Sequence, residues 1–103
     1  MVFESNFNVS LREVEDPKIE NGSDAIVRLT SSALCGSDLH MYEGRIPPKP
    51  GLVMGHEGMG VIEAVGDAVR LRKVGERVVM PAHVYCGVCV KCAEGKTAEC
   101  LTM

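Results

Sequence analysis

The sequence predicts a mainly β protein of one domain, with short helical turns and a cysteine-rich lobe. Three observations carry this prediction. Several segments are rich in β-branched residues, no stretch has the periodicity of a long amphipathic helix, and cysteines replace the apolar pattern from Ala82 onward. A chain of 103 residues, 46% hydrophobic and 24% charged, suits a single packed core.

The first two strands are expected in the N-terminal third of the chain. One surrounds Val9, and the other is the segment DAIVRLTSSAL from Asp24 to Leu34. The Asn21-Gly22 pair lies between them, and this pair favours turns because both residues tolerate positive φ. The two segments are therefore expected to form a hairpin.

The middle of the chain is expected to hold one helical turn and two more strands. The polar stretch from Gly36 to Tyr42 suits the helical turn, and the prolines within 47–50 exclude regular structure after it. Valine and isoleucine within Gly55 to Gly66, and valine within Glu76 to Pro81, predict the two strands. From 82 to 103 we expect a lobe too small for its own core.

Charge and targeting signals exclude several classes of partner. The net charge is -3 and the 11 basic residues are scattered, so no electropositive stripe for nucleic acid is expected. The N-terminal residues lack the basic start and apolar run of a signal peptide, and no window approaches the ~18 apolar residues of a membrane span. A cytoplasmic protein with no nucleic-acid or membrane partner is expected.

The five cysteines favour metal binding over disulfides, because reducing compartments keep thiols free. Four of them, Cys86, Cys89, Cys92 and Cys100, have the spacing C-x2-C-x2-C-x7-C. Gaps of two residues let successive sulfurs turn toward one ion, at about 2.3 Å from zinc. These four residues are therefore predicted to bind a structural zinc ion, with glycines allowing the tight turns and nearby lysines offering positive charge.

An iron–sulfur cluster is the main alternative for this lobe. Bacterial ferredoxins also begin with C-x2-C-x2-C, but their fourth cysteine follows after three residues and precedes a proline. Here the gap is seven residues and Leu101 follows Cys100. The spacing therefore favours zinc.

A second group of polar residues surrounds Cys35 in CGSDLH and His56 in GHE. A thiolate and an imidazole can meet if the ends of the two predicted strands are neighbours. Taken singly, a histidine at 56 and a cysteine at 35 equally suit structural roles in a core. The residues alone leave both roles open.

The order of the motifs resembles a known family. The run GHEGMG at 55–60, followed by Gly66 and Val69, resembles the zinc-containing signature of the medium-chain alcohol dehydrogenases. It stands between CGSDLH and the four cysteines, as in that family, and VGERV at 74–78 resembles a further turn. The similarity extends from about Asp24 to the end, and CGSDLHMYEGR and TAECLTM look most like the formaldehyde-dehydrogenase-like branch.

The resemblance implies the N-terminal part of a catalytic domain with the GroES-like fold, a partly open barrel. It implies that Cys35 and His56 bind a catalytic zinc and that Glu57 lies beside it as an occasional ligand or as a neighbour of the ligands. Zinc would act there as a Lewis acid that favours loss of the alcohol proton.

The resemblance also implies roles for three polar residues near Cys35. Ser37 would take the substrate proton, His40 would pass it toward solvent, and Asp38 would orient the imidazole of His56. Each has an alternative: Ser37 and Asp38 are residue types that cap helical turns, and His40 is also typical of an exposed loop.

The implied activity is hydride transfer between an alcohol or aldehyde and NAD or NADP. The dinucleotide fingerprint G-x-G-x-x-G is absent from residues 1–103, because Glu63 stands where a third glycine is required after Gly58 and Gly60. We therefore expect a Rossmann domain and a third zinc ligand only in a full-length protein, and no catalysis by this chain alone. Unpaired sheet edges predict self-association. The alternative is a zinc-stabilised interaction module without catalysis.

Overall fold

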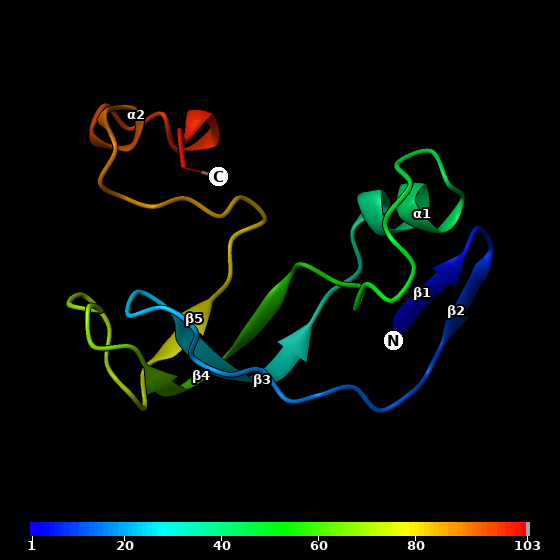
Figure 1. The fold of residues 1–103 in the computed structure, drawn as a ribbon, viewed down its shortest axis with the longest axis horizontal. Coiled ribbons are helices and arrows are strands. Elements are labelled where there is room, and N and C mark those ends of the chain that lie inside the picture. The colour runs from blue at the N-terminus through cyan, green and yellow to red at the C-terminus, as the bar shows by residue number, and fades with distance from the viewer. Residues whose placement is uncertain (103) are drawn as a thin grey trace.

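A computed structural model describes residues 1–102. They form five strands and three short helices (Figure 1). In chain order these are β1 (Val2–Ser5), β2 (Asn8–Ser10), β3 (Ala25–Ser32), α1 (Gly36–Tyr42), β4 (Gly58–Val65), β5 (Arg77–Val79), α2 (Val90–Ala93) and the 3-10 helix η1 (Thr97–Glu99). The expected mainly β fold with short helical turns is confirmed, and within residues 1–102 the sheets do not close into a barrel.

The larger sheet is antiparallel and has the order β3-β4-β5. Its central strand β4 pairs with β3 from Ala25↔Val65 to Ser32↔Gly58, and its first half pairs with β5. Burial along β4 falls on alternate residues at its start, with Gly58, Gly60 and Ile62 buried. This alternation is the pattern expected of a strand with one face against the protein. The three strands predicted in this part of the chain are confirmed.

The predicted pairing of the first two strands is wrong. The strand around Val9 is β2, and it forms a hairpin with β1, not with β3. A turn does form at Asn21, since the N–H of Asp24 donates to its carbonyl at 3.0 Å, but the turn lies against the end of β4, where the N–H of Ala68 donates to Gly22 at 2.9 Å. The Asn21-Gly22 turn therefore connects to β3 at the end of β4 and does not join β2 to β3.

The core is small, and two of its three buried apolar residues lie on β1. Val2, Phe3 and Ile62 are 1%, 2% and 3% exposed. Backbone bonds fix β1 to the loop before β4: the N–H of Phe3 donates to Leu52 at 2.9 Å, and the N–H of Gly51 donates to Phe3 at 2.8 Å. This packing holds the chain just before His56 in place.

The cysteine lobe, residues 82–102 of the described chain, is built differently. None of its residues is buried, and it contains only α2, η1 and irregular backbone. Figure 1 shows it standing away from both sheets at the end of an extended segment that follows β5. None of the helices described in residues 1–102 is long and apolar enough to cross a membrane.

Candidate metal centres

The four cysteine sulfurs of the lobe, here the thiolate quartet (Cys86, Cys89, Cys92 and Cys100), converge on one point. All four Sγ atoms lie within 4.8 Å of one another, and those of Cys86 and Cys92 are 4.0 Å apart. Sulfurs at about 2.3 Å from a tetrahedral zinc are about 3.8 Å apart. The quartet therefore has the spacing and the chemistry that a tetrahedral zinc requires.

Local backbone geometry brings the quartet together. Gly87 and Gly95 have φ of 76° and 79°, values that favour glycine, and they allow the tight turns expected on either side of α2. The turns also aim N–H groups at sulfur: the N–H of Cys89 donates to Cys86 Sγ at 3.3 Å, and that of Cys86 donates to Cys100 Sγ at 3.4 Å. The backbone thus favours negative charge on the sulfurs.

The thiols of the quartet differ in acidity. The Thr102 hydroxyl, followed by backbone N–H groups, lowers the pKa of Cys86 to about 6, and the same hydroxyl first lowers the pKa of Cys100. Burial raises the pKa of Cys92 to about 12. In the metal-free chain a proton therefore stays on Cys92 at neutral pH, and metal binding has to displace it.

The lysines near the quartet have other partners. The Nζ of Lys91 lies 3.0 Å from Glu99 Oε2, and the Nζ of Lys96 lies 3.0 Å from Glu94 Oε2. Their positive charges are thus directed to carboxylates. Among the described hydrogen bonds, the donors to the sulfurs are backbone N–H groups and the Thr102 hydroxyl, not ammonium groups.

The second centre, here the imidazole cluster (Cys35, His56 and Glu57), is assembled by the sheet. The ligand atoms of these three residues lie within 4.8 Å of one another. Antiparallel pairing ends at Ser32↔Gly58 and continues with a bond from the N–H of Ala33 to the carbonyl of Glu57 at 3.1 Å. The residues just after β3 therefore lie beside those just before β4. Cys35 and His56 thus do come together, a point that the sequence alone did not decide.

The imidazole of His56 is oriented by two residues of α1. Its Nε2 lies 3.2 Å from Ser37 Oγ, and its Nδ1 lies 3.2 Å from Asp38 Oδ1. Asp38 is 3% exposed, and its Oδ2 accepts the N–H of Cys35 at 2.9 Å. Oδ1 has no well-aligned hydrogen bond, so its contact with His56 is electrostatic. Asp38 thus combines the two roles set out for it, capping α1 and facing the ring.

Protonation in the imidazole cluster follows this geometry. The Ser37 hydroxyl and backbone N–H, and then His56, lower the pKa of Cys35. The Cys35 sulfur raises the pKa of His56, with a further contribution from the carboxylate of Asp38 and against the effect of desolvation. Both shifts act in the direction of a thiolate beside a protonated imidazole, and a divalent cation bound there would replace the imidazole proton.

His40 is the predicted site residue that these contacts do not join to the cluster. It lies in α1 with an exposed side chain, and its carbonyl accepts the N–H of Arg45 at 2.8 Å. Among residues 1–102, no hydrogen bond or ion pair links its ring to Ser37. Its part in a proton path stays a prediction.

Sequence reasoning missed Thr102. Its hydroxyl lies 3.4 Å from Cys100 Sγ, which makes it the side-chain oxygen nearest to the quartet among the described hydrogen bonds. A hydroxyl two residues after a cysteine ligand was the available signal.

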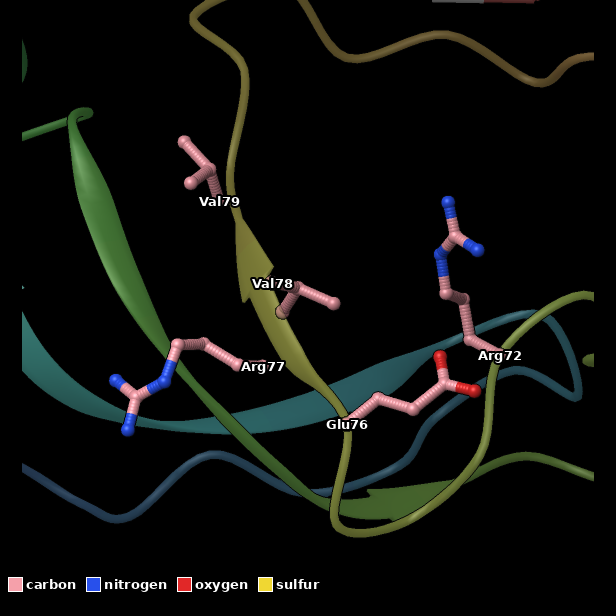
Figure 2. A pocket seen from close by; sticks show the side chains of 5 residues that line it. All are labelled: Arg72, Glu76, Arg77, Val78 and Val79. Atoms are coloured by element: carbon pink, nitrogen blue, oxygen red, sulfur yellow. The ribbon is translucent and has the colours of Figure 1, made fainter.

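A hollow on β5 belongs to neither centre. It has a volume of about 440 Å³ and is lined by Arg72, Glu76, Arg77, Val78 and Val79. Figure 2 shows Arg77 and Val78 on opposite sides of β5, with Glu76 extending toward Arg72. No residue of the quartet or of the imidazole cluster lines this hollow.

The sequence matches a described family and several of its members. The profile of the alcohol dehydrogenase GroES-like domain matches residues 21–103. An uncharacterized zinc-type alcohol dehydrogenase-like protein of Bacillus subtilis is 45% identical over 94 residues, 90% of this chain and 25% of the relative. A glutathione-independent formaldehyde dehydrogenase of Pseudomonas aeruginosa is 39% identical over 99 residues, 93% of this chain and 24% of the relative. The chain spans about a quarter of the length of these relatives.

Solved structures of alcohol dehydrogenases also match this chain. The alcohol dehydrogenase TADH from Thermus sp. ATN1 superposes with a TM-score of 0.91 at 42% identity, over 97% of this chain and 29% of that one. The short chain alcohol dehydrogenase RspB from Escherichia coli CFT073, complexed with its cofactor NADH, superposes with a TM-score of 0.72 at 41% identity, over 96% of this chain and 28% of that one.

Proposed function

Because the chain belongs to the alcohol dehydrogenase GroES-like domain family, we propose that it is the zinc-binding, N-terminal catalytic-domain portion of an oxidoreductase. The reaction is hydride transfer between a small alcohol or aldehyde and NAD or NADP. The location is the cytoplasm, which is consistent with five free cysteines. The chain's match to a formaldehyde dehydrogenase supports an aldehyde or its hydrate as one substrate class.

The observation that carries this proposal is the imidazole cluster with its two helix residues. A purely structural zinc site is closed by four protein ligands. Here a thiol, an imidazole and a carboxylate meet, and Ser37 Oγ lies 3.2 Å from the ring of His56. This arrangement suits a catalytic centre that keeps a position open for substrate.

The residues divide the work of the reaction. Cys35 and His56 would hold a zinc ion that supplies Lewis acidity when bound, and Glu57 would be an additional ligand or a neighbour of the ligands. Ser37 Oγ accepts the proton of the substrate hydroxyl and His40 passes it toward solvent. The carboxylate of Asp38, 3.2 Å from Nδ1 of His56, favours a proton on that nitrogen by its charge, which would leave Nε2 as the ligand atom.

Zinc content tests this division. We expect two zinc ions per chain for the parent protein, one for His56→Ala and one for Cys92→Ser, by elemental analysis of protein made without chelators. Glu57→Gln is expected to lower affinity at the imidazole cluster only. One ion in the parent, unchanged by His56→Ala, supports the zinc-stabilised interaction module instead. Absence of any transition ion contradicts both.

Hydride transfer needs groups that these 103 residues do not supply. They contain no G-x-G-x-x-G run to bind a dinucleotide. The isolated chain is therefore proposed to be inactive, and NAD(P)-dependent alcohol oxidation by it alone would contradict this.

Self-association is the remaining part of the proposal. Within residues 1–102, β3 and β5 each have a partner on one side only, so each presents unpaired backbone groups along its outer edge. We expect the sedimentation coefficient to rise with protein concentration. A strictly monomeric profile at high concentration would contradict the expectation.

A further inference from the structure

The charge balance of the thiolate quartet depends on a small number of donors. Four thiolates and one divalent zinc carry an excess of two negative charges, so such sites require hydrogen-bond donors around the sulfurs. Lys91 and Lys96, the cations nearest in sequence, lie 3.0 Å from carboxylates of Glu99 and Glu94. Donation to sulfur comes instead from backbone N–H groups and from one hydroxyl.

That hydroxyl belongs to Thr102. Its Oγ1 lies 3.4 Å from Cys100 Sγ, and the same sulfur accepts the N–H of Cys86 at 3.4 Å. A metal-bound thiolate has no proton, so the hydroxyl can only donate in this pair. Hydrogen bonds to charged acceptors are stronger than those between neutral groups.

We propose that Thr102 is the side-chain donor of the thiolate quartet, and that its hydroxyl raises the affinity of the quartet for a divalent metal ion. The inference rests on the proposed structural metal site and adds to it a residue that is not a ligand. Thr102 acts through sulfur and not on the metal: by withdrawing charge from Cys100 Sγ, which it contacts, and from Cys86 Sγ, it lowers the mutual repulsion of the four sulfurs around the ion.

The test compares Thr102→Val with Thr102→Ser in the full chain, both carrying His56→Ala so that the quartet alone titrates. Valine keeps the shape and the backbone N–H and removes only the hydroxyl. Thr97→Val is the matched control, because Thr97 lies in the same lobe and makes no described bond to sulfur. Zinc affinity is measured by competition with a chelating dye, and the thiolate-to-cobalt absorption band is recorded after Co²⁺ replaces Zn²⁺.

We expect Thr102→Val to bind zinc about 10-fold more weakly, within the range for residues that support metal ligands. Its cobalt band should move to longer wavelength, because the sulfur electrons are less stabilised. Thr102→Ser should restore both values, and Thr97→Val should match the parent. Equal affinity and equal spectra for Thr102→Val and the parent would overturn the role of Thr102 alone. A parent that binds neither ion would overturn the structural metal site together with it.

Discussion

Asp38 is the residue on which the imidazole cluster most depends for its orientation. It is buried, accepts the N–H of Cys35 through one oxygen and faces Nδ1 of His56 with the other. One side chain therefore fixes both the start of α1 and the ring. Asparagine in its place keeps the shape and the acceptor and removes the charge.

Asp38→Asn is expected to lower the pKa of His56 in the metal-free chain. In the parent, Cys35 and then Asp38 hold this pKa above its usual value of 6.5. A raised pKa contributes stability that is fully present below the unfolded pKa and is lost as pH rises through the folded pKa. The variant should therefore lose stability mainly at acidic pH. Imidazole NMR titration gives the midpoint, and Glu63→Gln on β4 is the control; an unchanged midpoint would contradict the contact.

Phe7 is the described non-glycine residue with a positive φ, 58°. Its N–H donates to the carbonyl of Tyr42 at 2.8 Å, and the two rings meet edge to face with centroids 5.5 Å apart. This contact joins the β1–β2 hairpin to the end of α1. A strained backbone conformation is thus retained where two elements meet.

Comparing Phe7→Gly with Phe7→Ala separates backbone strain from the ring contact. Both variants lose the ring, but only glycine adopts positive φ without a Cβ penalty. Phe7→Gly should therefore be more stable than Phe7→Ala by about 1 kcal/mol in urea unfolding. The opposite order would show that residue 7 has negative φ in solution.

At the scale of elements, the close approach of β3 to β4 depends on glycine. A Cβ built at Gly60 would overlap the carbonyl oxygen of Arg28 on β3. Because this neighbour is backbone, neither strand can yield by a simple side-chain rotation. The spacing that brings Cys35 to His56 is set by the same pairing.

Gly60→Ala is therefore expected to cost about 1–3 kcal/mol of unfolding free energy, as for other overpacked sites. It should also reduce zinc content at the imidazole cluster. Gly36→Ala is the control, because a Cβ there meets nothing within 4 Å. Equal stability of the two variants in urea would contradict the close approach.

The elements that local pattern specifies were predictable. The helical turn from Gly36 to Tyr42 and the strands β3, β4 and β5 lie where the sequence placed them. The hairpin of β1 and β2 was not predictable. Asn21-Gly22 indicates a turn, but it does not indicate which strands pair with each other. β1 gave too short an apolar run to be recognised, although Val2 and Phe3 form much of the core.

The two candidate metal centres also differed in how far the sequence could predict them. The quartet was predictable because its ligands lie between residues 86 and 100, so local spacing alone brings the sulfurs together. Cys35 and His56 meet only through the register of β3 on β4, which no local pattern encodes. The resemblance to a known family was needed to predict that pair. The contact between Thr102 and Cys100 could be found only from the folded structure of the lobe.

At the scale of the whole molecule, the sheets and the cysteine lobe are stabilised by different interactions. The sheets have a small apolar core at Val2, Phe3 and Ile62, whereas no described residue from 82 onward is buried. A lobe without a core would depend on the proposed metal ion in order to stay folded.

Removing metal with a chelator should therefore affect the two parts unequally. We expect amide hydrogen exchange to accelerate in α2 and η1, while exchange in β3 and β4 stays largely unchanged. Exchange followed by mass spectrometry resolves the two regions. Equal loss of protection in both would show that the lobe and the sheets unfold as one unit.

The extended segment between β5 and the lobe keeps the ligand set of the quartet local. All four sulfurs lie between residues 86 and 100, whereas the register of the larger sheet is set by residues 25–32, 58–65 and 77–79. Substitutions in the lobe and in the sheet can therefore be tolerated independently of each other.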